Sequence, residues 1–530
     1  MEHDRARRAF RFTWSLTPLA VALLAVQDIS AQTTWFVDDD ACPGPGSGTR
    51  VDPFCRVQDG ISAALDGDTV LVLPGTYLET IDFLGKAILL RSDGDGRPGT
   101  HDLDPEGTIL DGGGAGSVVT FATGEGPGSV LEGLTITGGL AVQEGGGVYC
   151  DGASPTLSHN IIRTNEALGI AFTGRGAGGG IFLRGSTSRI TDNRIEDNLA
   201  TGTCLTAVPC AASGYGGAIA AEDSSLEIVR NTIHSNTALG RAAFDSGGDT
   251  VGPEGLDGAG RGGGLYLRNS SAEVLDNVFE SNTAAGVCSG FGCANGAFGG
   301  AIYCDASSVS IRRNALLANS ATGVCSDSCG GDFSIGGGIL CVGGSTVVVD
   351  NCILAGNSMV LGAGTGIAAL TGASLTVQRT SITDNFAFSG SGGGVFVSGA
   401  TCTIDGSILR NNAPVEILGP AVVTYSNVEG GHVGQGNLDA DPQWAAAGDY
   451  HLQPGSPCID AGDPADSPAG QDLAGNPRLL DGDLDLTRVI DMGAHEFDNV
   501  HLTISGSAVP GGTLVIDTDG TAGLVVLLIV

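Results

Sequence analysis

A short phrase of two or three glycines followed by an aliphatic residue returns along this chain, once in a reduced form with a single glycine before Ile367. The aliphatic positions are Val148, Ile181, Ile219, Leu265, Ile302, Ile339, Ile367 and Val395. Their successive spacings are 33, 38, 46, 37, 37, 28 and 28 residues. An array of one supersecondary unit with variable loops has this signature. Because so small a unit cannot bury its apolar face alone, the pattern predicts a solenoid of stacked coils.

Each of the first five glycine phrases is followed by two asparagines that lie five residues apart. These pairs are Asn160/Asn165, Asn193/Asn198, Asn231/Asn236, Asn277/Asn282 and Asn314/Asn319. The segments between the marks are short, β-branched and without helical period. Glycine suits the corners between strands, and asparagine side chains can hydrogen-bond from coil to coil. We predict an all-β fold, a parallel β-helix of about ten coils with a short β-rich C-terminal segment, in which the aliphatic positions form one buried stack.

The first 31 residues have the composition of a secretory signal. Arg5, Arg7, Arg8 and Arg11 precede an apolar run over residues 16–26, and Ala31 follows as a cleavage position. The apolar run is too short to predict a membrane span in the mature chain, and an uncleaved signal anchor is the alternative. The chain carries a net charge of −35, which excludes nucleic acid and anionic membranes as partners.

Fourteen cysteines in an exported chain indicate disulfides. Four pairs are close in sequence and are expected to bridge locally: Cys42/Cys55, Cys204/Cys210, Cys288/Cys293 and Cys325/Cys329. Zinc is the alternative, but no histidine lies near these pairs. Cys150, Cys304 and Cys341 occupy a strand position that holds Leu or Val in other coils, so we interpret them as small core residues. Cys304 and Cys341 would lie in adjacent coils, which also permits a bridge.

Three stretches carry a family resemblance. Segments 35–40 (Trp-Phe-Val-Asp-Asp-Asp), 57–61 (Val-Gln-Asp-Gly-Ile) and 73–79 (Leu-Pro-Gly-Thr-Tyr-Leu-Glu) resemble the start of secreted bacterial right-handed parallel β-helix proteins of the pectin-lyase-like fold. The glycine and asparagine marks are similar to the repeats of polymorphic outer-membrane proteins. Segments 450–463 and 491–496 (Asp-Met-Gly-Ala-His-Glu) resemble the choice-of-anchor Q segment. The resemblance implies a signal peptide over 1–31, a β-helix over 32–432, a cap over 433–497 and a tail over 498–530 that could begin an anchoring module.

The same resemblance implies little about activity. Polysaccharide lyases of this fold use an arginine or lysine base beside acidic residues that hold calcium or neutralise the substrate. Lys86 is the only lysine and lies in a phrase typical of an ordinary N-terminal coil. The Asn-Thr-Asp, Asp-Asp and Gly-His pattern of pectin hydrolases is absent.

One predicted face carries a pattern of rings and charges. If the aliphatic residue points inward, the second and fourth strand positions face outward. The second position holds Tyr149, Phe182, Tyr266 and Tyr303, our candidate substrate-binding residues. The fourth holds Asp151, Arg184, Glu222, Arg268 and Asp305, with alternating sign. A structural ion-pair ladder is the favoured interpretation. The alternative is an exposed glycan groove, in which Arg184, Glu222 and Arg268 are the candidate catalytic residues of a lyase.

Two acidic groups are candidates for calcium, weighed against plain acidic loops. The first contains Asp93 and Asp95, and the second contains Asp481, Asp483 and Asp485. The second begins like an EF-hand loop but has Leu486 and Met492 where the turn glycine and the bidentate glutamate should be.

These observations favour an exported, non-catalytic scaffold, secreted or at the cell surface and monomeric, that binds a polysaccharide or another cell-envelope component. A polysaccharide lyase or related depolymerase acting on acidic glycans is the first alternative, and an adhesin or passive surface protein is the second. The fold alone cannot separate them.

Overall fold

The computed structural model describes residues 32–94, 102–170, 174–203, 210–243, 258–289, 295–325, 332–390, 392–466, 470–498, 502–505 and 515–518. The chain divides into two compact units, Met1–Gln32 and Thr33–Val530, and the second holds the elements below. The predicted signal peptide and Asp95 lie outside the described residues. No helix in the described part of the chain is long and apolar enough to cross a membrane.

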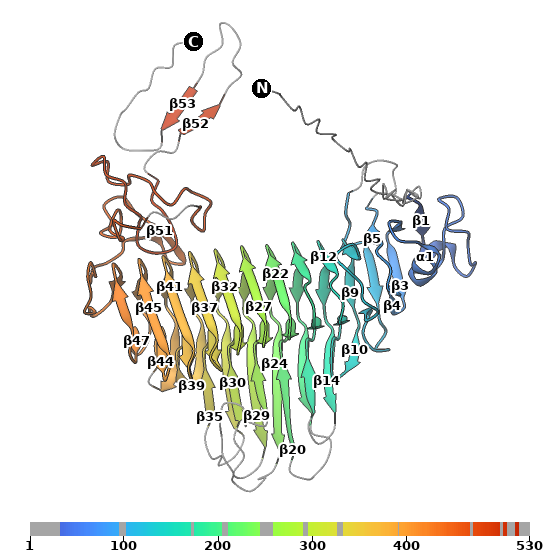
Figure 1. Cartoon of the computed structure of the whole chain (residues 1–530), viewed down its shortest axis with the longest axis horizontal. Helices are drawn as coiled ribbons and strands as arrows, with labels where there is room; N and C mark the ends of the chain where they lie inside the picture. The colour runs from blue at the N-terminus through green and yellow to red at the C-terminus, as the bar shows by residue number, and fades with distance from the viewer. Residues whose placement is uncertain are drawn as a thin grey trace, which may run out of the picture. The chain divides into compact units, whose positions relative to one another are not determined.

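The second unit is a parallel β-helix in which three long sheets form the walls of the coil (Figure 1). Sheet 1 contains, in spatial order, β1 (Thr34–Val37), β2 (Thr69–Val72), β5 (Leu89–Ser92), β8 (Val130–Glu132), β12 (Thr156–Ser158), β17 (Arg189–Thr191), β22 (Ser225–Val229), β27 (Ser271–Leu275), β32 (Ser308–Arg312), β37 (Thr346–Asp350), β41 (Ser374–Gln378), β45 (Thr401–Asp405) and β48 (Val422–Thr424).

Sheet 2 contains β3 (Gly75–Leu78), β6 (Thr108–Asp111), β9 (Thr135–Thr137), β13 (Ile161–Arg163), β18 (Arg194–Glu196), β23 (Thr232–His234), β28 (Val278–Glu280), β33 (Ala315–Leu317), β38 (Ile353–Ala355), β42 (Ser381–Thr383), β46 (Ile408–Arg410) and β49 (Asn427–Val428). Sheet 3 contains β4 (Ile81–Asp82), β7 (Val119–Phe121), β11 (Val148–Asp151), β16 (Ile181–Arg184), β21 (Ile219–Glu222), β26 (Leu265–Arg268), β31 (Ile302–Asp305), β36 (Ile339–Val342), β40 (Ile367–Leu370), β44 (Val395–Ser398) and β47 (Ile417–Leu418). With eleven to thirteen strands per sheet, the coil is longer than the predicted ten turns.

The predicted stack of aliphatic residues is confirmed. The eight residues from Val148 to Val395 pair in register from β11 to β44, strand by strand. Each of them is fully buried. Their column is part of one continuous apolar core inside the coil.

The predicted asparagine ladders are also confirmed. In the longer ladder, the side-chain amide of each asparagine donates to the amide oxygen of the next coil, at 2.8 to 3.0 Å, from Asn165 to Asn412. The ladder ends on Glu416, which accepts from the backbone N–H of Asn412 at 3.0 Å. In the shorter ladder, Asn314 is followed by Cys352, whose thiol lies 3.4 Å from the Asn314 backbone nitrogen. The buried amides of the shorter ladder satisfy the polar backbone at the corners between sheets 1 and 2, and those of the longer ladder do so where each coil leaves sheet 2.

Two short helices precede the regular coils, and neither was predicted. They are the 3₁₀-helix η1 (Asp39–Ala41) and the α-helix α1 (Val57–Ala63), which buries Val57 and Ile61 against the first coils. Lys86 donates to the carbonyls of Ile61 and Ser62 at the end of α1, at 2.7 and 2.8 Å. A cation is favourable at that terminus, so the only lysine of the chain has a structural role.

Between sheets 2 and 3, the chain makes an excursion that we call the fin, seen below the coil in Figure 1. The outgoing strands are β10 (Leu140–Val142), β14 (Glu166–Ile170), β19 (Leu199–Thr203), β24 (Thr237–Ala243), β29 (Thr283–Ser289), β34 (Ser320–Cys325), β39 (Ser358–Ala363) and β43 (Phe386–Gly390). The return strands are β15 (Arg175–Ala177), β20 (Cys210–Tyr215), β25 (Ala259–Arg261), β30 (Asn295–Phe298) and β35 (Asp332–Ile335). Both ladders are parallel and join through β39.

The two layers of the fin pack backbone against backbone. A Cβ atom at Gly240 would lie 2.3 Å from the carbonyl carbon of Ala259, and one at Gly202 would lie 2.3 Å from that of Ala212. Real Cβ atoms do not approach other atoms so closely, so these positions require glycine. The alanine-x-glycine pattern of the outgoing strands therefore has a packing role that the sequence analysis did not recognise.

The predicted disulfide between Cys42 and Cys55 is present. Cys150, Cys304 and Cys341 are free, buried core residues, as are Cys352, Cys402 and Cys458. Cys204, Cys293 and Cys329 lie outside the described residues, so the three local loop disulfides stay predictions. The backbones of Cys288 and Cys325 are register partners on β29 and β34.

After the last coil, residues 433–498 form a cap with one small antiparallel pair, β50 (Trp444–Ala446) and β51 (Asp449–Leu452). The cap contacts the outer side of sheet 2, where the Ala494 N–H donates to the Ser381 hydroxyl at 3.2 Å. Arg478 is buried within the cap and lies 3.1 Å from Glu496. In the tail, β52 (Leu502–Ser505) and β53 (Val515–Thr518) pair antiparallel.

Candidate functional site

The predicted ring positions of sheet 3 form an aromatic column on the outside of the coil. Tyr266 and Tyr303 stack with ring centroids 5.4 Å apart, and Tyr149 and Phe182 stack at 5.9 Å. These rings belong to an apolar cluster separate from the coil core, so their predicted direction is confirmed.

The rings of this column are covered, so the open glycan groove that was the alternative interpretation is not present here. Phe182, Tyr266 and Tyr303 are 0%, 3% and 4% exposed, and only Tyr149 is half-buried. The reason is the fin, because its return strands lie over the column with Tyr215, Ala259 and Phe298 among other residues. Sugar rings therefore have no open aromatic face to stack on along this column.

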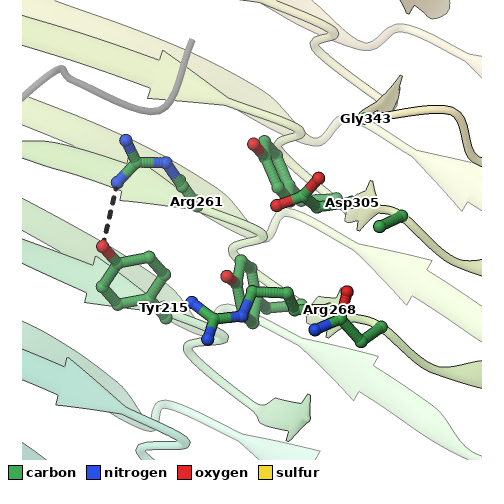
Figure 2. Close-up of a pocket in the computed structure, with 9 residues that line it drawn as sticks. Tyr215, Arg261, Arg268, Asp305 and Gly343 are labelled. Carbon is green, nitrogen blue, oxygen red and sulfur yellow. Dashed lines mark hydrogen bonds between the residues drawn. The ribbon is translucent and has the colours of Figure 1, made fainter. Parts of the chain in front are cut away.

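The cover leaves one cavity of about 400 Å³ between sheet 3 and the fin (Figure 2). It is lined by Tyr215, Arg261, Tyr266, Arg268, Asn269, Tyr303, Asp305, Ala306 and Gly343. Strands β20 and β25 of the fin supply Tyr215 and Arg261, and strands β26 and β31 of sheet 3 supply most of the remainder. Among the predicted site residues, the fold thus brings Tyr266, Tyr303 and Arg268 together.

Arg261 enters the cavity from the fin and was not predicted. Its guanidinium donates to the Tyr215 hydroxyl at 3.3 Å, as the dashed line in Figure 2 shows. It lies 5.2 Å from the Tyr215 ring centroid and 5.7 Å from that of Phe298. Although burial opposes its charge, the neighbouring Tyr215 hydroxyl contributes to a raised pKa of Arg261. Arg261 lies just before a glycine phrase, in a part of the sequence whose length varies from repeat to repeat, so the repeat pattern did not indicate it.

The second arginine of the cavity, Arg268, lies 3.9 Å from Glu222. Burial is the largest single effect on Arg268 and lowers its pKa, but Glu222, Tyr266 and Asp305 together outweigh it, so the pKa is raised. Burial also raises the pKa of both Tyr266 and Tyr303, so their phenols stay neutral. The cavity therefore offers two cations, neutral phenols and the Asp305 carboxylate to a ligand.

Arg184 and Glu222 do not line the cavity. Arg184 binds Asp151 with two hydrogen bonds of 3.0 and 3.1 Å and also lies 3.4 Å from Glu144. Glu222 is buried and bonds to Arg175 of the fin as well as facing Arg268. The favoured ion-pair ladder is thus confirmed for the pairs Asp151–Arg184 and Glu222–Arg268.

The ion pairs of Arg184 and Arg268 also affect how readily these two side chains exchange protons. The hydrogen bond with Asp151 raises the pKa of Arg184, and Arg268 is shifted in the same direction. A general base must be able to accept a proton near the working pH. The partners of both arginines favour the charged form of the side chain, which suits the binding of an anion.

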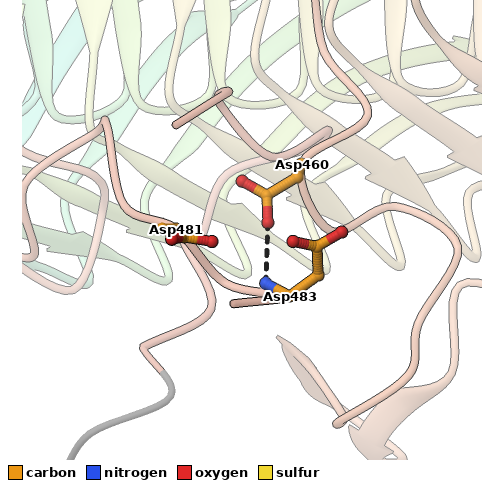
Figure 3. A group of neighbouring side chains, drawn as sticks. All are labelled: Asp460, Asp481 and Asp483. Atoms are coloured by element: carbon orange, nitrogen blue, oxygen red, sulfur yellow. Dashed lines mark hydrogen bonds between the residues drawn. The ribbon is translucent and has the colours of Figure 1, made fainter. Parts of the chain in front are cut away.

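The second acidic group is partly assembled in the cap (Figure 3). One carboxylate oxygen from each of Asp460, Asp481 and Asp483 lies within 4.8 Å of the others. Asp460 was not predicted, and its carboxylate accepts from the Asp483 N–H at 2.8 Å. Asp485 instead accepts from the Thr487 N–H at 2.6 Å. These oxygen donors are of the type that calcium takes, although three carboxylates supply only part of its six to eight ligands.

The first acidic group is not a cluster in the described structure. Asp93 is buried where sheet 1 turns after β5, and Asp95 is outside the described residues. Among the residues described, the Asp460 group is the one set of three or more histidine, cysteine or acidic side chains with ligand spacing.

Comparison with known proteins agrees with this architecture. Residues 108–299 match the family model of the right-handed beta helix region. The fold is similar to that of XylC, solved in complex with xylose, at 11% identity over 78% of this chain and 87% of XylC, with a TM-score of 0.39. It is also similar to pectate lyase Pel9A, at 13% identity over 89% and 98% of the chains and a TM-score of 0.33. A pectin methylesterase from carrot matches at 12% identity over 57% and 82%, with a TM-score of 0.21.

No curated protein matches the sequence. The likenesses to solved structures concern the fold alone. Together with the three parallel sheets, the matched region defines this chain as a right-handed parallel β-helix protein.

Proposed function

We propose that this protein is an exported β-helix scaffold, secreted or held at the cell surface, that binds carbohydrate in the cavity between sheet 3 and the fin. The observation that carries the proposal is the pairing of Arg261 and Arg268 in one cavity lined by three tyrosines. In a chain of net charge −35, this is a local concentration of positive charge. Its size lies within the range of small-ligand sites.

The lining suits an acidic sugar unit. A guanidinium recognises a carboxylate with two parallel hydrogen bonds, and it does so best where water is excluded. The phenols of Tyr266 and Tyr303 and the amide of Asn269 can exchange hydrogen bonds with sugar hydroxyls. Asp305 can accept from a hydroxyl and, by its charge, restricts how many anionic groups enter together.

The proposal is binding without cleavage. The lyase alternative needs Arg184 or Arg268 to accept a proton, and the raised pKa of each opposes this. No observation in the described residues favours the lyase over the binding protein. The adhesin remains the second alternative, and it differs in requiring no defined glycan.

Export rests on the sequence of residues 1–31 and on the Cys42–Cys55 disulfide, which is typical of oxidising compartments. The proposal includes the predicted resemblance of the repeats to polymorphic outer-membrane proteins and of the cap to a choice-of-anchor Q segment. In this view, the coils display the cavity and the C-terminal segments connect the scaffold to the cell.

A glycan array with acidic and neutral oligosaccharides tests the proposal. The wild type is expected to bind uronate-containing glycans, and Arg268→Gln is expected to lose this binding by roughly tenfold or more. Arg230→Gln is the matched control, since Arg230 is about as exposed and is paired with Asp192 at 2.7 Å, outside the cavity. Absence of wild-type binding, or equal binding by Arg268→Gln, would reject the cavity as the site.

A further inference from the structure

A groove of about 550 Å³ lies on the outer face of sheet 1, away from the cavity under the fin. It is lined by residues from, or directly before, five consecutive strands of the sheet, β17, β22, β27, β32 and β37. Consecutive strands belong to consecutive coils, so the groove runs along the coil axis. At ~4.8 Å per coil, five strands extend over ~19 Å. A ligand that uses the whole groove must therefore be elongated.

One side of the groove is a row of exposed hydroxyls. Ser225, Ser271, Ser308 and Thr346 are each the first residue of their strand, and they are register partners in sequence order. The Ser271 hydroxyl lies 2.8 Å from that of Ser225. The row presents one hydroxyl per coil, and each hydroxyl can both donate and accept.

The other side of the groove carries charge at its N-terminal end. Arg189 lies 3.4 Å from Glu227, and Glu273 follows Glu227 in register on the next strand. Glu273 is exposed and has no ion pair with another described residue. With one arginine and two glutamates, this side is net negative and would repel a polyanion. Along each strand, the groove residues alternate with core residues such as Leu226 and Val309, which point into the coil core.

From this geometry we infer that the groove binds one extended chain of a neutral polysaccharide, laid along the coil axis. Repeated sugar hydroxyls find a hydroxyl partner on every coil, and the glutamates can accept from hydroxyls at one end. Each contact is weak in water, but the regular spacing allows several to form together along one chain. The inference does not depend on the cavity, because the two sites use different sheets and opposite charge.

Affinity electrophoresis of the full chain in native gels tests the groove. The probes are hydroxyethyl cellulose, an extended neutral glycan, and polygalacturonate, an extended acidic one. Ser308→Arg places a long side chain in the middle of the groove. Ser374→Arg is the matched control, because Ser374 is the exposed first residue of β41 in the same row but does not line the groove. Thermal unfolding checks that both variants are folded, and Thr346→Arg repeats the block at another coil.

Hydroxyethyl cellulose is expected to retard the wild type, Ser374→Arg and the cavity variant Arg268→Gln alike. Ser308→Arg and Thr346→Arg are expected to bind it roughly tenfold more weakly. No retardation of the wild type by hydroxyethyl cellulose, or equal retardation of the blocked variants, would overturn the inference. If the wild type is retarded by hydroxyethyl cellulose but not by polygalacturonate, the result counts against the cavity and supports the groove.

Discussion

At the scale of single residues, Tyr266 combines a packing role with a proposed binding role. Its ring stacks on Tyr303 and meets the edge of the Tyr215 ring at 5.0 Å. In the glycan-groove alternative, the side chain would lie outside the core and its loss would change folding little. The fin buries it, so truncation must now affect stability as well as binding.

We expect Tyr266→Ala to lower the free energy of unfolding by about 3 kcal/mol, since it removes a buried ring from a packed cluster. Tyr266→Phe keeps the ring and should cost about 1 kcal/mol or less, while removing a hydroxyl from the cavity lining. Denaturant unfolding of both variants measures the difference. A loss below about 1 kcal/mol for Tyr266→Ala would mean that the fin does not cover the column.

Glu416 gives a pH-dependent contribution to stability. Glu416 closes the asparagine ladder at Asn412, and burial there raises its pKa to about 7. Because the folded pKa lies above the unfolded one near 4.5, the folded chain holds a proton that the unfolded chain has lost. The resulting stability is present below pH ~4.5 and is lost as the pH rises to about 7, by up to ~3 kcal/mol.

The difference in unfolding free energy between wild type and Glu416→Gln isolates this contribution, since other titrating groups cancel in the comparison. It should shift in favour of the variant by ~1–3 kcal/mol between pH 4 and 8. A difference that does not change over this pH range would show that Glu416 is charged in the folded state.

At the scale of elements, the fin is the part of the fold that positions the cavity. Its return strands carry Tyr215 and Arg261, and its two layers approach so closely that side chains larger than hydrogen do not fit at the glycine positions. A substitution that disturbs the packing of the fin should therefore disturb the cavity as well.

Gly240→Ala is expected to destabilise the fin by ~1–3 kcal/mol, because the added methyl group meets the rigid backbone of Ala259. Hydrogen exchange should quicken in β24 and β25 while the core strands of sheet 1 stay protected. Gly126→Ala is the control, since a Cβ there has nothing within 4 Å. Unchanged exchange in the fin of Gly240→Ala would contradict the close packing.

The coil and the fin also show what could be predicted from the sequence. The buried stack and the ladders were predictable because Ile181 and Asn193, like their equivalents, recur at the same place in each coil. The fin could not be predicted, because the segments that connect its outgoing and return strands differ in length from repeat to repeat. Its glycines were also indistinguishable from loop glycines. Arg261 was missed for this reason, and α1 was missed because it is a single short helix with Gly60 inside it.

The cap shows the same limit for a site. Asp481 and Asp483 were predicted together because they alternate in sequence, but Asp460 joins them only through the fold of the cap. Asp485 was included by its spacing, although it bonds to its own turn instead. Local spacing predicts neighbours within a loop, whereas partners from another loop depend on tertiary structure.

At the scale of the whole molecule, the described residues form an acidic right-handed β-helix, with a cationic cavity between a coil wall and a fin made by the same repeats. We propose that this cavity binds acidic carbohydrate and does not cleave it. The fold alone does not distinguish binding from cleavage, so the two activities must be separated by experiments on this chain.

The most direct test measures binding and cleavage on one sample. The full chain is titrated with oligogalacturonates by calorimetry, and the recovered sugars are analysed for chain length and unsaturated ends. If the cavity binds acidic carbohydrate without cleaving it, we expect saturable heat that Arg268→Gln abolishes and Arg230→Gln retains, with oligosaccharides of unchanged length. Shortened, unsaturated products, or no saturable heat from the wild type, would contradict it.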